Sequence, residues 1–372
     1  MRILHLADFH LKLTGPRAEE CRRILDWIPE NAREVKPDAI IIAGDVYDRR
    51  STPEERLYLA SILSALADVA PVFAINGNHD DSEDLRLFHQ WRPEIEIITE
   101  PTLRPLKGKT LAFLPWPSLG HLAAAIGPQA SIAERREIAK AALIDVLRGF
   151  KSPTLLVAHI SVTGASMDTG QPVSGGEEIA LSADELLECG AAGVALGHIH
   201  LRQQMRTGCQ PVWYAGAPFR NSFGEASGKK GGLIWNWNGQ SWDVMPWDLP
   251  ARDMTLLEAS MIDGKLIDKE HDDLRDFFGR DAEVRLRIEF PSEEREAARA
   301  QAEEWKARCL EAHALSVTIE ERPIVITRSR CAEIEKARTP ADKLAAWAHT
   351  TDQEIPEGVA GKLTMLEAEA RP

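Results

Sequence analysis

Ala191-Ala192-Gly193-Val194-Ala195-Leu196-Gly197-His198-Ile199-His200 is the stretch of this sequence that decides its fold. Its apolar first part predicts a buried strand bounded by glycines. In an extended chain, residues two apart point the same way, so His198 and His200 can face one site from the strand end. A histidine pair of this kind means little alone, because most such residues are ordinary polar groups without a ligand.

Four more polar clusters occupy the same position, each directly after an apolar run. Because the carboxyl ends of parallel strands share one edge of a sheet, five such clusters predict a single site. The clusters and the runs before them are Asp8 and His10 after Ile3–Leu6, Asp45 after Ala39–Gly44, Asn78 and His79 after Val72–Ile75, and His159 after Leu155–Ala158.

The candidate metal ligands of this site are two carboxylates, one amide oxygen and four imidazoles. Seven ligands exceed the coordination number of one ion but suit two ions that share a carboxylate. Oxygen and nitrogen donors without thiolate favour manganese, iron or zinc over a structural zinc site. Two metals roughly 3.5–4 Å apart form a clamp for phosphoester hydrolysis. His79 is left free as a general acid, since its ordinary pKa of about 6.5 suits proton transfer at neutral pH. The seven predicted ligands are Asp8, His10, Asp45, Asn78, His159, His198 and His200.

In chain order the motifs are Asp8-x-His10, Gly44-Asp45, Gly77-Asn78-His79-Asp80, His159 and Gly197-His198-x-His200. The set resembles the five motifs of the calcineurin-like metallophosphoesterases. Within that superfamily the chain is similar to the SbcD-type DNA nuclease subunits, because the stretches Asp45–Asp48 and Tyr214–Glu225 resemble two of their signatures. Two positions depart from the pattern, since Ala217 replaces a usual Ser and Phe9 a usual Trp or Leu.

The resemblance implies a four-layer αββα sandwich, residues 1–249, followed by a small α+β cap, residues 250–372. It implies a manganese-dependent DNA exo/endonuclease that works with an SbcC-type coiled-coil ATPase in DNA end processing and repair, and a homodimer. In this scheme Asp45 bridges the two metals. The first metal is held by Asp8, His10, Asp45 and His200, and the second by Asp45, Asn78, His159 and His198.

Two other functions stay open at this point. One is a stand-alone phosphodiesterase or phosphatase that acts on small phosphoesters. The other is a dimerising adaptor of the ATPase with weak chemistry. Seven candidate ligands and a free His79 argue against the adaptor, which has no need of them.

Composition predicts a soluble globular protein, with 44% hydrophobic and 27% charged residues among 372. No apolar run approaches the ~18 residues of a membrane span. The chain enters its first strand without a signal-peptide layout, and its five cysteines are scattered, which favours reduced thiols in the cytoplasm.

A net charge of -14 gives no global attraction for DNA, so binding would need local basic patches or a partner. Five basic residues lie near the motifs in sequence, and they either touch a phosphate backbone or are solvated surface charges. These residues are Arg202, Arg206, Arg220, Lys229 and Lys230.

Several local features carry their own predictions. Thr52, Pro53 and Glu55 predict a capping box and a helix whose apolar face includes Leu57. Asp48 either orients a ligand or caps that same helix. Residues 103–114 predict a hairpin, whereas 212–218 and 232–237 predict antiparallel strands that close a second sheet. Beyond residue 250, Ser292 is predicted to cap a long helix between two strands, and shorter helices are predicted at 330–336 and 341–348.

Overall fold

In the computed structural model, the first of two six-stranded sheets is built around four parallel strands that alternate with helices α1 (Ala18–Val35) and α2 (Pro53–Ala67). Two further strands join it antiparallel beside the first strand of the chain. The strand order is β14 (Trp242–Asp248), β13 (Gly231–Trp237), β1 (Arg2–Leu6), β2 (Ala39–Ala43), β3 (Val72–Ile75) and β4 (Ile95–Ile98).

The second sheet has four parallel strands in its middle and an antiparallel strand at each edge. Helices α5 (Ile132–Gly149) and α6 (Ala183–Leu186) accompany it, and a two-stranded sheet joins β8 (Ser161–Val162) to β9 (Ala180–Leu181). The strand order is β11 (Gln203–Arg206), β12 (Val212–Tyr214), β10 (Val194–Gly197), β7 (Leu155–His159), β6 (Lys109–Leu114) and β5 (Thr102–Leu106).

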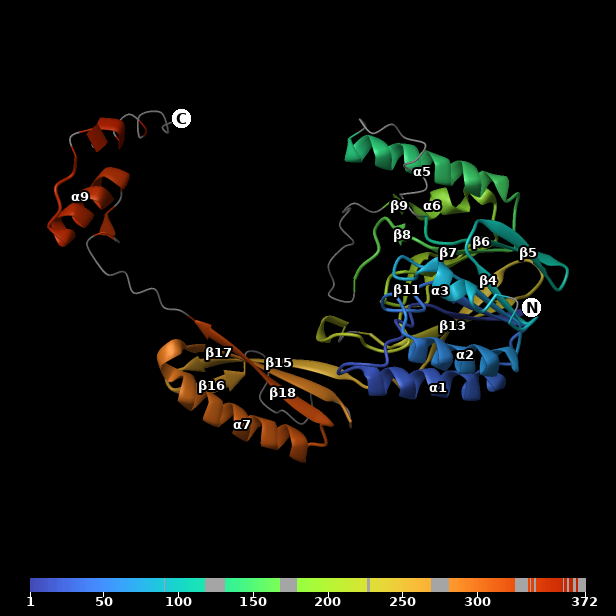
Figure 1. Cartoon of the computed structure of the whole chain (residues 1–372), viewed down its shortest axis with the longest axis horizontal. Coiled ribbons are helices and arrows are strands. Elements are labelled where there is room, and N and C mark those ends of the chain that lie inside the picture. Colours follow the sequence, from blue (N-terminus) through green and yellow to red (C-terminus); the bar gives the residue numbers. More distant parts are fainter. Residues whose placement is uncertain are drawn as a thin grey trace. The chain divides into compact units, whose positions relative to one another are not determined.

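Alternation along the strands shows how the layers pack. In β2, Ile40 and Ile42 belong to the cluster that includes α1 and α2, whereas Ile41 belongs to a cluster that includes Phe113 and Val157 of the second sheet. Side chains two apart share a face, so each sheet packs on helices with one face and on the other sheet with the opposite face. Figure 1 shows α1 and α2 on one side of the strands and α5 and α6 on the other. The predicted four-layer αββα sandwich is confirmed.

The structure describes most of the chain, and some predictions fall outside what it describes. Residues 160–178 are rich in Gly, Ser and Thr, and the long loop that this composition predicts is only partly included, as is the helix predicted at 330–336. The described residues are 1–89, 91–117, 131–167, 179–225, 228–268, 281–324, 334, 336–337, 339–356, 358–359, 361–363 and 366.

One strand prediction was wrong in part. Residues 212–218 and 232–237 were expected to be antiparallel strands that close one second sheet, but they contribute to different sheets. β12 runs parallel to β10 in the second sheet, whereas β13 is antiparallel to β1 in the first. An apolar strand fits a central place in either sheet, so its residues alone do not select its partner.

The start of α2 is as predicted, and its predicted apolar face is buried at Leu59, Leu63 and Leu66 but not at Leu57. Thr52 accepts a hydrogen bond from the Glu55 backbone, and the Glu55 carboxylate accepts one from the Thr52 backbone. Leu57, however, is 74% exposed, and Ile62 is buried instead. Helical spacing identifies an apolar stripe, but which edge of the stripe is covered depends on the packing of neighbouring elements.

Two strands and a helix follow residue 280, as the sequence predicts, but the cap of the helix differs. A 3₁₀ turn, Ser292–Glu294, precedes α7 (Arg295–Glu311), so Ser292 lies inside this turn, and its hydroxyl donates to the Ile324 carbonyl oxygen. Two additional strands were missed. The four-stranded sheet has the order β16 (Lys265–Asp268), β15 (Met254–Ile262), β17 (Glu283–Pro291) and β18 (Ser316–Ile324).

The chain divides into two compact units. The larger comprises Met1–Leu257, His271–Leu286 and Trp305–Ile319, and the smaller comprises Glu258–Glu270, Arg287–Glu304 and Glu320–Pro372. The division at residue 249 stays a prediction, as does the capping role of the later region. In the smaller unit, α9 (Pro340–Thr351) starts with a capping box at Thr339, close to the helix predicted at 341–348. No helix among the described residues has both the length and the apolar character needed to cross a bilayer.

Candidate metal centre

The carboxyl ends of β1, β2, β3, β7 and β10 carry all seven predicted ligands. Four of these residues, Asp8, His10, Asp45 and His198, have positive φ angles of 54°, 43°, 50° and 104°. Such angles strain any residue with a Cβ, and strain of this kind concentrates at functional sites. At these four residues the positive φ angle turns the backbone sharply at the strand end, and the side chain stays at the edge of the sheet.

Glycines allow these loops to approach one another. A Cβ at Gly77 would lie 2.1 Å from Asp45 Oδ1, and one at Gly44 would lie 2.2 Å from His159 Nδ1. At Gly197 the added atom would lie 1.9 Å from the Ala43 carbonyl oxygen. These contacts are far below van der Waals distance, so the three positions exclude side chains.

Replacing Gly77 with Ala is therefore expected to displace Asp45 and to lower the predicted phosphoester hydrolysis by roughly 100-fold, since errors of about 1 Å in a site cost that much. Gly149→Ala is the matched control, because a Cβ at Gly149 meets nothing within 4 Å. Hydrolysis rates of both variants, with thermal unfolding as a folding check, test this expectation. Equal activity of a folded Gly77→Ala variant and the control would contradict it.

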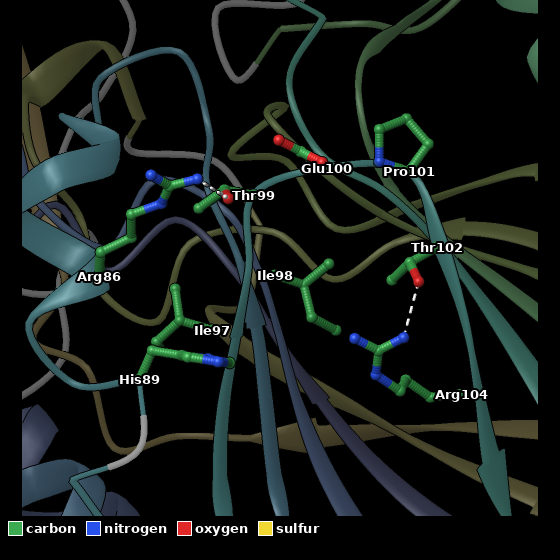
Figure 2. A pocket seen from close by; sticks show the side chains of 9 residues that line it. All are labelled: Arg86, His89, Ile97, Ile98, Thr99, Glu100, Pro101, Thr102 and Arg104. Carbon is green, nitrogen blue, oxygen red and sulfur yellow. Dashed lines mark hydrogen bonds between the residues drawn. The ribbon is translucent and has the colours of Figure 1, made fainter.

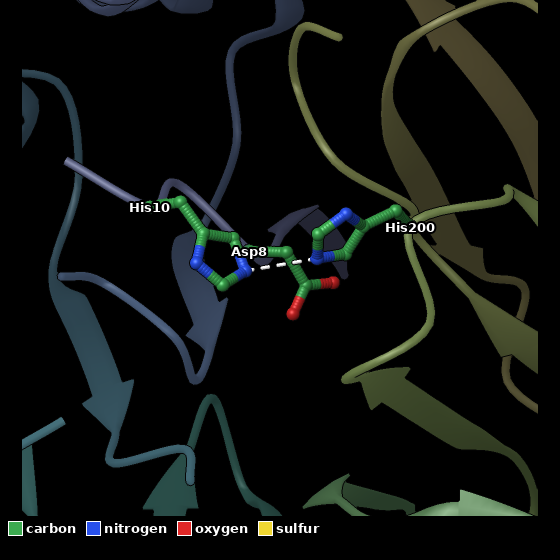
Figure 3. Close-up of side chains that lie close together, drawn as sticks. All are labelled: Asp8, His10 and His200. Atoms are coloured by element: carbon green, nitrogen blue, oxygen red, sulfur yellow. Dashed lines mark hydrogen bonds between the residues drawn. The ribbon is translucent and has the colours of Figure 1, made fainter. Parts of the chain in front are cut away.

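Asp8, His10 and His200 form the first group of side chains that could hold a cation. The Nε2 atoms of His10 and His200 lie 2.8 Å apart, and Figure 3 shows both rings beside the Asp8 carboxylate. Asp8 Oδ1 accepts a hydrogen bond from the His198 backbone at 2.8 Å. This bond links the loop after β1 in one sheet to the loop after β10 in the other.

Asp45 lies between two imidazoles. Its Oδ2 is 3.5 Å from His10 Nε2, and its Oδ1 is 3.4 Å from His159 Nε2. The side chain is 2% exposed. Asp45 thus shares one group of potential ligands with His10 and His79, and another with His159 and His198.

Asn78 joins the second group through its side-chain oxygen. Asn78 Oδ1 lies 3.0 Å from His159 Nε2 and 3.0 Å from His198 Nδ1. His159 Nδ1 donates to the Ala43 carbonyl oxygen at 2.7 Å, which turns Nε2 toward Asp45 and Asn78. The structure therefore brings all seven predicted residues together at one edge of the sandwich.

Burial and charge act on the ionisable groups in opposite directions. Burial penalises the charged forms of Asp45 and His159, but their mutual attraction and the contacts with other groups together outweigh it, so the Asp45 pKa falls and the His159 pKa rises to about 9. The other groups are His10 and the His79 backbone for Asp45, and Asp8 and the Ala43 carbonyl for His159. For Asp8 burial prevails and raises the pKa, and for His10 burial lowers the pKa to about 3.

At three places in the site, the polar atoms are arranged so that a bound cation could contact them. Among the described residues, Asp8 Oδ2 is buried without a hydrogen-bond partner, which is costly for a carboxylate. The ring nitrogens of His10 and His200 face each other, and two further ring nitrogens face one amide oxygen. This donor set of carboxylate and amide oxygens and imidazole nitrogens fits divalent metal ions.

His79 is exposed and projects from the loop after β3. Its Nδ1 lies 2.9 Å from the Asp48 carbonyl oxygen, which can only accept, so Nδ1 carries a hydrogen and Nε2 is available. Its backbone N–H donates to Asp45 Oδ1 at 3.0 Å. A His79 ring nitrogen also lies within 4.8 Å of ligand atoms of His10 and Asp45, so geometry leaves room for a ligand role.

Two acidic residues, Asp80 and Asp48, support the site without being predicted ligands. Asp80 accepts backbone hydrogen bonds from Val46, Tyr47 and Gly77, and so ties the Asp45 loop to the Asn78 loop. Burial and nearby Asp45 raise the Asp80 pKa to about 6.

Asp48 does not cap α2, since Thr52 does. It pairs with Lys12 and lies 3.7 Å from His10 Nδ1, as expected of the orienting alternative.

Glu225 contacts the ring nitrogen of His200 that does not face His10, and Lys230 in turn contacts Glu225. Glu225 Oε1 lies 2.9 Å from His200 Nδ1, and Glu225 Oε2 is 3.0 Å from the buried Lys230 Nζ. Although burial opposes its charge, contact with His200 and Lys230 lowers the Glu225 pKa to about 2. Trp116, after β6, has its ring 5.2 Å from that of His198. Only Glu225 had a sequence signal, as the last residue of the Tyr214–Glu225 stretch.

The five basic residues considered for DNA binding all have acidic partners. Arg202 and Lys229 both pair with Asp248, Arg220 with Asp253, Arg206 with Asp184 and Lys230 with Glu225. Paired charges release fewer counterions from a phosphate backbone than free ones would.

A pocket of about 560 Å³ lies between the edge strands β4 and β5, away from the predicted ligands (Figure 2). Its two arginines are also paired, Arg86 with Glu83 and Arg104 with Glu96. The pocket contains none of the seven candidate ligands. Its lining residues are Arg86, His89, Ile97, Ile98, Thr99, Glu100, Pro101, Thr102 and Arg104.

Comparisons with known proteins show what this chain is similar to. The sequence profile of the family described as "Calcineurin-like phosphoesterase" matches residues 1–202. A protein of Bacillus subtilis (strain 168), named as the D subunit of the nuclease SbcCD, is 32% identical over 250 residues, which cover 61% of this chain and 63% of that protein. Its namesake in Escherichia coli (strain K12) is 30% identical over 259 residues, covering 62% and 63%. The match thus spans less than two thirds of both relatives. A crystal structure of a Thermus thermophilus protein aligns with 66% of this chain and 98% of its own, at 13% identity and a TM-score of 0.41.

Proposed function

The chain belongs to the calcineurin-like phosphoesterase family, and from this membership we propose that it hydrolyses phosphodiester bonds of DNA as an SbcD-type nuclease. One observation carries the proposal. Asp45 lies between His10 and His159 and thereby connects two groups of Asp, Asn and His side chains at a single sheet edge. Such a shared carboxylate suits a pair of divalent cations.

Two metal ions would be held by the seven candidate residues, and the family resemblance favours Mn²⁺. Asp8, His10 and His200 would hold one, and Asn78, His159 and His198 the other, with Asp45 bridging. When bound, such ions lower the pKa of a water and stabilise negative charge on phosphoryl oxygens. The buried Asp8 oxygen without a partner and the facing imidazoles support this assignment.

His79 would supply a proton to the leaving oxygen. Its Nδ1–H is engaged by the Asp48 carbonyl, so Nε2 is the atom able to carry and release that proton. The Asp45 carboxylate fixes the backbone of His79 through the N–H bond, which holds the acid close to the shared carboxylate. General acid catalysis of this kind contributes about 100- to 10,000-fold.

DNA is proposed as the substrate because both curated relatives are named as nuclease subunits. The net charge of -14 and the ion-paired basic residues favour help from a partner in holding duplex DNA. The "SbcCD" in the relatives' names leads us to propose an SbcC-type ATPase as that partner. A homodimer is part of the same proposal.

The test is a cleavage assay with Mn²⁺ on single-stranded DNA, duplex DNA and a small nitrophenyl phosphodiester. We expect metal-dependent cleavage of DNA strands, and duplex cleavage that increases when the ATPase and ATP are supplied. Hydrolysis of the small ester with no cleavage of any DNA would favour the stand-alone phosphodiesterase. No hydrolysis of any substrate would contradict both enzyme functions.

Deleting residues 330–372 is expected to leave cleavage of short single strands largely intact, because all seven candidate ligands lie before residue 201. The same deletion should abolish the response of duplex cleavage to partner and ATP. In α9, Trp347 is 41% exposed, and aromatic side chains are enriched at protein–protein interfaces. Rates with and without the ATPase test this. A truncated protein that responds like the full chain would contradict the docking role.

A further inference from the structure

Residues 215–225 and 228–230, described parts of the chain between β12 and β13, include several that contact His200. The Ala217 backbone N–H donates to the His200 carbonyl oxygen at 3.0 Å, and a Cβ at Gly216 would lie 2.8 Å from that oxygen. The Lys230 ammonium lies 3.3 Å from the same carbonyl oxygen. These residues supply no candidate ligand themselves, but they contact His200, which is one.

Glu225 and Lys230 extend this support to the His200 ring. Glu225 uses one carboxylate oxygen for His200 Nδ1 and the other for Lys230 Nζ. The Glu225 side chain is 12% exposed and that of Lys230 is 2% exposed. A buried carboxylate keeps its charge only when it is paired, so Lys230 stabilises the ionised Glu225 that the His200 contact requires.

The contact determines which ring nitrogen of His200 is free. An ionised carboxylate can only accept, so His200 Nδ1 must carry the hydrogen, and Nε2 keeps its lone pair. That Nε2 is the atom turned toward His10 at 2.8 Å and grouped with Asp8. Partners of this kind fix the orientation and tautomer of metal-binding histidines, and their loss lowers metal affinity about 10- to 100-fold.

We propose that Glu225 and Lys230 are positioning residues that present His200 Nε2 to the cation of the Asp8–His10–His200 group. The inference rests on the proposed function, because it assumes that this group holds an ion. Glu225 belongs to none of the potential ligand groups among the described residues, so it acts through His200. The effect should therefore be confined to one of the two ions.

The test measures Mn²⁺ binding by calorimetry, with metal content as an independent readout. In Glu225→Gln, which keeps the shape of the side chain but not its charge, one binding event should weaken by roughly 10- to 100-fold while the other is unchanged. Lys230→Met should weaken the same event. Glu185→Gln is the matched control, since Glu185 also pairs with a lysine, Lys140, at 2.9 Å, but contacts no candidate ligand in the described structure.

A double-mutant cycle separates positioning from general destabilisation. In a His200→Ala background, Glu225→Gln should weaken Mn²⁺ binding no further, because the side chain through which it acts is gone. Unchanged affinity in Glu225→Gln, equal weakening of both events, or additive losses in the cycle would overturn the proposal. Wild-type protein that binds no Mn²⁺ would overturn the proposed function itself, whereas normal wild-type binding with an unaffected Glu225→Gln overturns only this inference.

Discussion

Asp45→Asn is expected to abolish phosphodiester hydrolysis and to reduce the metal content of the purified protein. In the part of the chain that the structure describes, Asp45 is the carboxylate that shares potential ligand groups with both His10 and His159, and its two oxygens lie 3.5 Å and 3.4 Å from these histidines. Two unit charges 4 Å apart repel by about 4 kcal/mol at an effective dielectric of 20, and the repulsion between two dications is fourfold larger. The asparagine amide has the same shape as the aspartate carboxylate, but it lacks the negative charge that offsets the repulsion between the two cations.

Elemental analysis after Mn²⁺ loading and rates on a nitrophenyl phosphodiester measure the two effects separately. Asp38→Asn is the control, because Asp38 precedes the strand that Asp45 follows and its carboxylate pairs with the Arg2 backbone and Lys107 instead. We expect the control to keep wild-type metal content and turnover. Two tightly held ions per chain with normal turnover in Asp45→Asn would show that the bridge is misassigned.

The places of the candidate ligands in the fold were predictable because each depends on a local pattern. An apolar run such as Ala39–Ala43 identifies a strand, and the polar residue after it marks the edge of the sheet where parallel strands end. The capping box at Thr52 was likewise readable, since it depends on residues three apart. Neither prediction needed knowledge of which strands are neighbours.

Long-range features could not be predicted in this way. β13 pairs with β1, more than 220 residues earlier in the chain, and no feature of its own sequence favours that partner over β12. The support of His200 by Glu225 and Lys230 has the same origin, because a carboxylate 25 residues away becomes a neighbour only after the sheets form. Exposure of Leu57 also depends on tertiary packing.

His79→Ala is expected to keep both metal ions and to lose about 100- to 10,000-fold in the rate of DNA cleavage. The proposed proton is needed because the leaving group from DNA is an alkoxide. A nitrophenolate is stable without protonation, so hydrolysis of a nitrophenyl phosphodiester should be much less affected. His89→Ala is the control, because His89 is an exposed histidine ten residues further on and belongs to none of the candidate ligand groups found in the described residues.

Metal content decides between the two roles that the geometry allows for His79. Its ring lies 4.9 Å from that of His10, and one of its nitrogens is close to Asp45, so a ligand role would also explain a slow variant. A ligand, however, supports hydrolysis of every substrate, whereas an acid matters only where the leaving oxygen needs a proton. A variant that lost a metal ion, or that was equally slow on DNA and on the nitrophenyl ester, would therefore assign His79 to the metal centre and leave the acid to be found elsewhere.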